Sequence, residues 1–259
     1  MKGGKLEKAV VARRWPNGVE CPRCGGKSVS FLEKYNRWQC GARHDNRQFT
    51  AKTGTIFEDS PLGLDKWLAA MRQVVNCKNG VSSYEVHRAI GVTQKTAWFM
   101  DHRIRHALTM GTINKLSGQI EAKVVPNRKK KALQAEIREH VLAGSAIFTD
   151  ALQSYEGLDE FQHEVVDHAV AYVNGECHTN GCENFWSLLK RGLKGTYVSV
   201  EPCHLFRYLD EQAWRYNNRK GMNDGDRFDL AVRQIVGKRL TWDQLTGKMG
   251  EPETQPEPF

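Results

Sequence analysis

Apolar and polar positions separate most clearly between His178 and Arg191, where the chain reads HTNGCENFWSLLKR. At about 100° per residue, this order places apolar side chains on one side of a helix and polar ones on the other. The polar side carries an amide, a carboxylate, a hydroxyl and an ammonium group, from Asn180, Glu183, Ser187 and Lys190. An ordinary amphipathic surface helix has the same pattern, so spacing alone leaves a structural and a catalytic helix both open.

A second helical pattern fills residues 64–108. In VSSYEVHRAIGVTQKTAWFMDHRIRHAL, Ser82 or Ser83 caps one expected helix, Gly91 ends it, and Thr93 caps the next. Two helices joined this way form either a DNA-binding helix-turn-helix or a plain helical hairpin in a core. In the first case, exposed polar side chains of the second helix would contact phosphates and base edges: Gln94, Lys95, Thr96, Arg103 and Arg105.

From residue 119 onward, strand and helix patterns alternate, as in an α/β domain. QIEAKVV (119–125) reads as a strand, Asn127 is placed to cap a helix that Gly144 ends, and SAIFTD (145–150) reads as a short buried strand. The second strand ends in Asp150. An aspartate there lies where α/β sheets bind ligands, but it is equally a common N-cap for a following helix.

The first sixty residues are loop-rich and carry the spacing of a metal site. Cys21 and Cys24 form a Cys-x2-Cys knuckle followed by two glycines, and Cys40 follows a strand-like run. Arg43 stands where a second knuckle would have its cysteine, so His44 is the nearest fourth ligand. The pattern predicts a structural zinc ribbon with three thiolates and one imidazole; the alternative is free buried thiols and a surface histidine.

The composition of the chain narrows the classes of molecule that it is expected to bind. The 259 residues carry a formal net charge of +8 and a pI near 9.1, which favours nucleic acid first and an anionic membrane surface second. The chain has no run of about 18 apolar residues and no apolar secretory leader, so we expect no membrane span and no secretion. Seven unevenly placed cysteines fit the reducing cytoplasm better than a disulfide framework.

Several long motifs together resemble one family, the zinc-ribbon-bearing ISXO-type insertion-sequence transposases of bacteria. The resemblance runs from about Cys21 to Leu245 and rests on the ribbon and on RQFTAKTGTIFEDSPLGLDKW, VSSYEVHRAIGVTQKTAWFM, IFTDALQSYEGL and HTNGCENFWSLLKRGLKGTY. It implies an RNase-H-like core with a DDE-type site in which asparagine replaces the third acidic residue. Asp150 then matches the second catalytic aspartate, Asn180 with Glu183 beside it the third position, and Lys190 the downstream lysine.

The resemblance also implies ligands and partners. These are catalytic Mg²⁺ in addition to the structural zinc, double-stranded DNA with terminal inverted repeats at the element ends, a homo-oligomer on that DNA, and association with the bacterial nucleoid.

The sequence departs from the family pattern where the first catalytic aspartate should stand, on the first core strand. Residues 111–149 contain no aspartate, and Glu121 and Glu136 are the acidic alternatives before Glu139. A block of several dozen residues holding the first two strands is missing. We therefore expect a multidomain α+β protein in four segments: zinc ribbon (1–60), helix-turn-helix (61–115), truncated RNase-H-like α/β core (116–238) and a partly disordered C-terminal tail (239–259).

The expected function is that of a transposase that cleaves and joins DNA at element ends, defective in this copy because the first aspartate is absent. One alternative is a non-catalytic, sequence-specific DNA-binding protein that uses the ribbon and the helix-turn-helix. Another is the product of an internally deleted gene that lacks a stable core.

Overall fold

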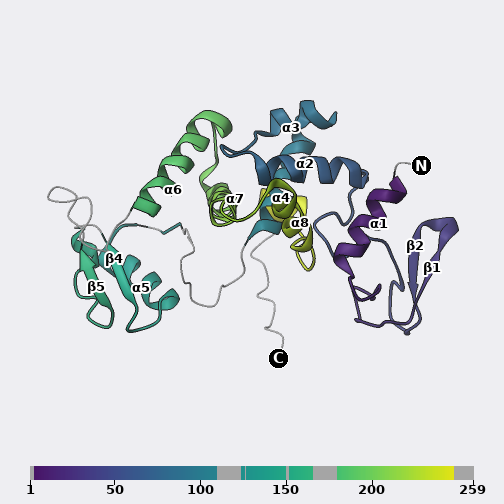
Figure 1. The fold of residues 1–259 in the computed structure, drawn as a ribbon, viewed down its shortest axis with the longest axis horizontal. Coiled ribbons are helices and arrows are strands. Elements are labelled where there is room, and N and C mark those ends of the chain that lie inside the picture. The colour runs from purple at the N-terminus through teal and green to yellow at the C-terminus, as the bar shows by residue number, and fades with distance from the viewer. Residues whose placement is uncertain (1–2, 110–123, 126, 150–151, 166–179, 248–259) are drawn as a thin grey trace. The chain divides into compact units, whose positions relative to one another are not determined.

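The structure, a computed structural model, describes residues 3–109, 124–125, 127–149, 152–165 and 180–247 (Figure 1). Among these residues helices predominate, with two small sheets, so the fold is mixed α and β. The chain divides into two compact units: residues 1–109 with 220–259 form the first, and residues 110–219 form the second. Among the helices that are described, none has the length and apolarity needed to cross a bilayer.

The first unit begins with helix α1 (Gly3–Arg14) and a three-stranded antiparallel sheet. The sheet order is β1 (Val29–Leu32), β2 (Arg37–Cys40), β3 (Gln48–Phe49), with the 3₁₀ turn η1 (Glu33–Tyr35) between the first two strands. Trp38 pairs with Phe49 across the sheet and stacks on it, and both rings meet Trp15 edge-on. This aromatic group packs beside Cys21 and Cys40, so the small core of the ribbon adjoins the predicted metal ligands.

Three helices follow: α2 (Leu64–Asn76), α3 (Ser83–Ile90) and α4 (Gln94–Leu108). The predicted caps are confirmed. The Ser82 hydroxyl accepts from the Glu85 amide while the Glu85 carboxylate accepts from the Ser82 amide, and the Thr93 hydroxyl accepts from the Thr96 amide. Gly91 takes the left-handed conformation (φ 63°) that ends α3, which explains the need for glycine there.

The C-terminal part of the chain returns to complete this unit with α8 (Asp224–Arg233) and α9 (Trp242–Thr246). Helix α8 contacts α1 and α2, and Asp229 accepts from Arg13 at 2.8–2.9 Å. Farther on, the Ile56 amide donates to the Ile235 carbonyl (3.1 Å) and the Gly237 amide to the Gly54 carbonyl (2.9 Å). The division thus differs from the expected one: residues 220–238 belong with the ribbon and not with the core, and the described residues 239–247 are a packed segment and not a tail.

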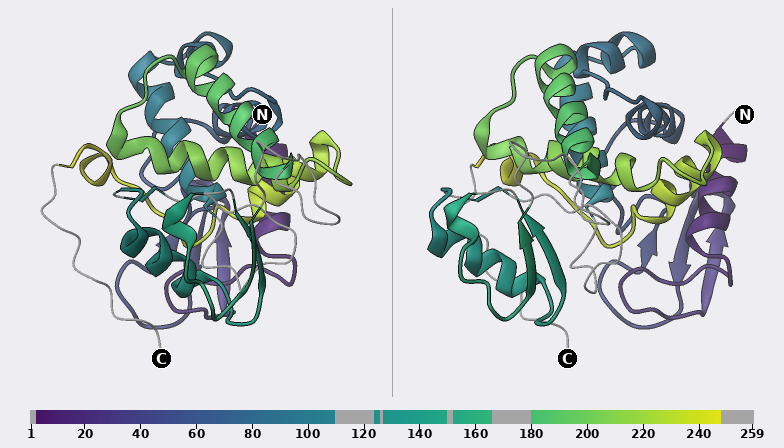
Figure 2. Two further views of the ribbon diagram at one scale, coloured as in Figure 1. Left: turned by 90° about the vertical axis from the view of Figure 1, so that its left-hand side faces the viewer. Right: turned by 60° about the vertical axis from the view of Figure 1, so that its left-hand side comes forward.

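The second unit contains α5 (Lys130–His140) and two parallel strands, β4 (Ala146–Thr149) and β5 (Gln162–Val165), which Figure 2 shows side by side next to the helix. The register pairs Ala146 with Gln162 and Thr149 with Val165. Strand β4 confirms the strand expected at 145–150. A 3₁₀ turn, η2 (Gln153–Tyr155), stands where a helix after Asp150 was the alternative.

Two expectations near α5 need correction. Asn127 is not the N-cap; its side chain accepts from the Lys129 amide (3.0 Å) in a local turn, and the helix begins afterwards at Lys130. The helix ends at His140, before Gly144. Residues 119–123 of the expected first strand lie outside the described residues, and Val124 and Val125 are not in a strand.

The rest of the second unit is a helical pair: α6 (Asn180–Arg191) and α7 (Leu205–Asn217), joined through a π-helical segment, η3 (Gly192–Tyr197), and the short turn η4 (Pro202–His204). Phe185 and Leu189 of α6 pack against Leu209, Ala213 and Tyr216 of α7. The amphipathic pattern of α6 is therefore confirmed, with Glu183, Ser187 and Lys190 exposed on the other side. The RNase-H-like architecture stays a prediction, because the described part of this unit holds a two-stranded sheet.

A lysine tests whether the C-terminal segment stabilises the first unit. Lys238 Nζ donates to the carbonyl oxygens of Ala107 (2.7 Å) and Thr109 (2.6 Å) at the end of α4. We expect Lys238→Ala to lower the free energy of unfolding by about 1–3 kcal/mol, because these part-buried bonds to a charged donor are lost. Thermal unfolding followed by circular dichroism measures this. Lys220→Ala, an exposed lysine of the same unit, is the control; equal midpoints for the two variants would contradict the role of Lys238.

Candidate functional site

The Cys21–Cys24 knuckle has the backbone of a metal-binding turn. The Gly25 amide donates to the Cys21 carbonyl and the Cys21 amide to the Gly26 carbonyl, both at 2.9 Å. Gly25 needs φ +68°, which favours glycine, and a Cβ on Gly26 would lie 3.2 Å from the Cys24 sulfur. Both glycines predicted from the sequence therefore have a local steric reason: they bend the chain tightly and leave room for the thiol groups.

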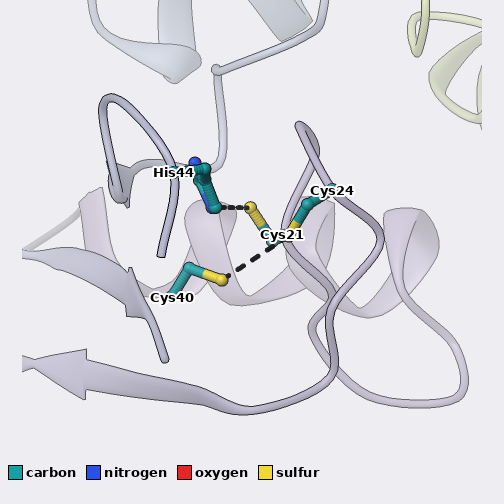
Figure 3. A group of neighbouring side chains, drawn as sticks. All are labelled: Cys21, Cys24, Cys40 and His44. Atoms are coloured by element: carbon teal, nitrogen blue, oxygen red, sulfur yellow. Dashed lines mark hydrogen bonds between the residues drawn. The ribbon is translucent and has the colours of Figure 1, made fainter. Parts of the chain in front are cut away.

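Figure 3 shows the side chains of Cys21, Cys24, Cys40 and His44 pointing toward one another, with their ligand atoms all within 4.8 Å. Cys24 Sγ lies 3.7 Å from Cys40 Sγ, and Cys21 Sγ lies 3.5 Å from His44 Nε2. Around a tetrahedral zinc ion, two sulfurs would be about 3.8 Å apart and a sulfur and a nitrogen about 3.6 Å apart. The four residues therefore fit zinc, and His44 is confirmed as the fourth member of the group.

The environment prepares these groups as ligands. His44 Nδ1 lies 2.7 Å from the Asp45 carbonyl oxygen, and a proton on Nδ1 that donates there leaves the Nε2 lone pair for a metal. Burial raises the pKa of the Cys21 thiol, but hydrogen bonds from the Arg23 and Cys24 amides and from neighbouring thiols outweigh it and bring the pKa to about 7. Burial raises the pKa of the Cys40 thiol.

The α3–α4 pair does not expose all of its expected contact residues. Arg103 is 4% exposed and Arg105 is 2% exposed, so the expectation that both face solvent is wrong. Arg103 donates to the Glu58 carbonyl oxygen (2.6 Å), and its guanidinium lies 5.4 Å from the ring centres of Trp67 and Phe99. Burial lowers its pKa to about 10, which still leaves the side chain charged at neutral pH. Arg103 therefore holds the loop before α2 against α4.

The first turn of α4 carries accessible polar side chains. Lys95 is exposed, while Gln94 and Thr96 are partly exposed. Gln94 Nε2 donates to the Ser83 hydroxyl (2.9 Å), which ties α4 to the start of α3. Lys95 Nζ lies 4.6 Å from the ring centre of Trp242 in α9, a neighbour that no local sequence pattern predicts. The first turn of α4 thus presents to a ligand the Lys95 ammonium group, which lies over the Trp242 ring, and the polar side chains of Gln94 and Thr96.

The candidate catalytic residues are placed only in part. Glu183 and Lys190 are both exposed on α6, two turns apart, which corresponds to about 10 Å along the axis. Asn180 begins the helix, but its side chain lies outside what the structure describes, and so does Asp150. The structure therefore confirms the helix that carries Asn180, Glu183 and Lys190, and it does not test whether these residues meet Asp150 at one metal site.

A second cluster of potential ligands lies on α5, where Glu136, Glu139 and His140 bring their ligand atoms within 4.8 Å. In the sequence, Glu136 is one of the acidic alternatives to an aspartate between residues 111 and 149. The spacing i, i+3 and i+4 alone places these groups on one side of a helix, and exposed acidic groups of this kind commonly hold no ion.

Comparison with known proteins identifies two segments of the chain. A family model described as an ISXO2-like transposase domain matches residues 77–217, which include α3 to α7 and all the candidate catalytic positions. A model described as a transposase zinc-ribbon domain matches residues 5–44, up to and including His44.

Two curated relatives agree with these matches. One, from Haemophilus influenzae, bears the name "uncharacterized transposase-like protein"; it is 37% identical over 97 residues, which are 37% of this chain and 78% of the relative. The other, from Halobacterium salinarum, is an uncharacterized protein in the transposable element ISH50; it is 27% identical over 252 positions that cover 76% of this chain and 84% of the relative. No solved structure matches.

The metal centre gives a direct prediction. Protein purified without chelator should carry one zinc ion per chain, and Cys24→Ser should remove it and unfold the ribbon, because structural zinc supplies much of the folding free energy of so small a domain. Elemental analysis and the near-ultraviolet signal of Trp15 and Trp38 measure the two effects. Cys203→Ser replaces an exposed thiol outside the ribbon and should keep full zinc content. Zinc-free wild-type protein would contradict the assignment.

Proposed function

Because the chain belongs to the family of insertion-sequence transposases with an ISXO2-like domain, we propose that it binds the DNA of its own element but does not cut it. The observation that carries this proposal is the aspartate-free stretch between residues 111 and 149, inside the matched transposase domain. The resemblance places the first catalytic aspartate in this region.

The charge available for metal binding supports the loss of cleavage. In the proposed family chemistry, two Mg²⁺ ions held by carboxylates activate the attacking oxygen and stabilise the leaving one. Of the candidate ligands here, Asp150 supplies one negative charge, Asn180 is neutral, and Glu183 supplies at most one more. Hard divalent cations need several oxygen ligands in fixed positions. One or two carboxylates are too few to hold two such ions close together.

The alignment with the haloarchaeal relative is consistent with a missing block. It runs over 252 positions, whereas 76% of the 259 residues of this chain is about 197 residues. About 55 aligned positions are therefore filled by the relative alone. This agrees in size with the several dozen residues that the motif spacing predicts to be absent, and such a loss would remove strands together with the first aspartate.

Retained DNA binding rests on the first unit and on charge. We propose that α3 and α4 act as a helix-turn-helix, with Gln94, Lys95 and Thr96 in the first turn of α4 toward the DNA. The net charge of +8 favours the approach of any duplex. The proposed specific sites are the terminal inverted repeats, where the chain would assemble as a homo-oligomer within the nucleoid.

A chain that binds DNA without cutting it acts as a non-catalytic DNA-binding protein derived from a transposase, which is the second function that the sequence suggests. An active enzyme would require a substitute for the first aspartate. Glu121 is the sequence candidate, since alternation in QIEAKVV would let it face the site if that segment became the central strand.

The DNA-binding surface is tested by two cationic residues with different burial. Lys95→Ala in the full chain should weaken binding to a labelled duplex and lower the slope of log K against log salt by about one, because one phosphate contact is lost. Arg103→Met should instead lower the free energy of unfolding by about 1–3 kcal/mol, because the Glu58 carbonyl loses its charged donor. Salt titrations and thermal unfolding separate the two effects; unchanged binding in Lys95→Ala would refute the assignment.

The catalytic defect is tested with a duplex carrying the element end. Full-length protein that binds this duplex should show no strand cleavage with Mg²⁺ or Mn²⁺ on a denaturing gel, since the site lacks carboxylates for two ions. Retained binding in the same preparation is the control for folded protein. Cleavage that disappears in Asp150→Ala would show that the site is active, and its loss in Glu121→Ala as well would identify the substitute ligand.

A further inference from the structure

We propose that Trp242 of α9 is a positioning residue for Lys95, so that the C-terminal segment shapes the DNA-contacting turn of α4. The inference rests on the proposed function, because it requires the first turn of α4 to face DNA. It adds a residue that neither the motif pattern nor the matched domain, which ends at residue 217, includes.

The aromatic ring is fixed against α4 itself. Trp242 meets Phe99 edge-on with ring centres 5.5 Å apart, and it meets Trp98 edge-on at 6.0 Å. Lys95 precedes Phe99 by one helical turn, and its Nζ lies 4.6 Å from the centre of the Trp242 ring. The ring therefore packs along one side of α4 and ends under the ammonium group.

Helix α9 is short, but it is well anchored. The Thr241 hydroxyl accepts from the Gln244 amide (3.3 Å), and the Gln244 side chain accepts from the Thr241 amide (2.8 Å), which makes a capping box. Leu245 is buried, and Gly247 ends the helix in the left-handed conformation. Just before α9, the Lys238 ammonium group donates hydrogen bonds to carbonyl oxygens at the end of α4. Trp242 thus lies between Lys238, which is hydrogen-bonded to α4, and the buried Leu245.

An aromatic ring holds a cation without neutralising it, and this is the reason to infer a role in DNA binding. Lys95 is exposed, and among the described residues no carboxylate forms an ion pair with it. A lysine held by a carboxylate would have to break that pair to reach a phosphate, whereas one held by a ring keeps its charge and its N–H donors. The ring also restricts the rotamers of a side chain that would otherwise lose much entropy on binding.

Arg103, on the same helix, shows the contrast. Its guanidinium also lies against aromatic rings, but it is buried and donates to the Glu58 carbonyl oxygen. The Arg103 guanidinium therefore stabilises the folded unit and is not available to a ligand. Of these two cations on α4, only Lys95 has a solvent-accessible charged group. Trp242 is the side chain that restricts the position of that group.

A double-mutant cycle on the full-length, zinc-loaded chain tests the inference, with a labelled DNA duplex of mixed sequence as the probe. Trp242→Leu should weaken binding about two- to fivefold, the range expected when an exposed cation–π contact is lost, and Trp242→Phe should weaken it less. In a Lys95→Ala background, Trp242→Leu should have no further effect, because the group that the ring positions is already gone.

A matched control uses a second lysine–ring pair among the described residues. Lys34 Nζ lies 5.6 Å from the ring centre of Tyr35 in the ribbon, far along the chain from α4. Tyr35→Leu combined with Lys95→Ala should give additive effects, whatever the ribbon contributes to binding. Equal zinc content and equal far-ultraviolet circular dichroism confirm that each variant is folded, and Trp242→Phe keeps an aromatic ring if the leucine variant loosens α9.

The outcomes separate this inference from the proposed function. If Trp242→Leu weakens binding by the same factor with and without Lys95, the ring acts independently of the lysine and the inference is overturned, while DNA binding by α4 stands. If the wild-type chain does not bind at low salt, or if Lys95→Ala binds like the wild type, the DNA role of α4 fails and the inference fails with it.

Discussion

The packing of residues 220–247 onto the ribbon and the α2–α4 helices is the interaction on which the first unit depends. Asp229 pairs with Arg13, Lys238 closes the end of α4, and backbone hydrogen bonds join residues 54–56 to residues 235–237. All of these contacts come from residues 1–109 and 220–247. None of these contacts therefore depends on residues 110–149, where we propose that strands have been lost.

Burial also determines which charges are available to a nucleic acid. The net charge of +8 counts every arginine and lysine equally, but Arg14 and Arg103 are largely enclosed by protein. Burial lowers the pKa of each to about 10, so both stay protonated and bind backbone carbonyl groups of the surrounding loops. Such cations stabilise the unit, and the electrostatic attraction of DNA at close range depends on exposed groups such as Lys95.

The small core of the ribbon is a physical reason to expect that zinc binding stabilises its fold. Its strands are two to four residues long, and its core consists of a few aromatic rings beside two thiols. So few apolar contacts bury little surface, and the free energy of zinc binding then becomes free energy of folding. Helices α6 and α7, by contrast, bury five side chains against one another.

The sequence by itself determined what depends on neighbours along the chain. The caps at Ser82 and Thr93, the glycine at residue 91, the zinc ligands, the strand at 146–149 and the two sides of α6 all follow from short-range spacing and turn sterics. The absence of aspartate from residues 111–149 is likewise visible in the sequence alone.

Only the tertiary structure decided which cations are accessible and where distant segments pack. Arg103 and Arg105 look like exposed helix residues, and residues 239–247 look like the start of a tail, because hydrophobic spacing reports one helix at a time. Arg103 is buried against the loop before α2, to which it donates a hydrogen bond at Glu58, and residues 239–247 belong to the compact unit that residues 1–109 form. The contact of Trp242 with Lys95 joins segments far apart in sequence, and no local pattern encodes a contact that forms only when the C-terminal segment folds back onto α4.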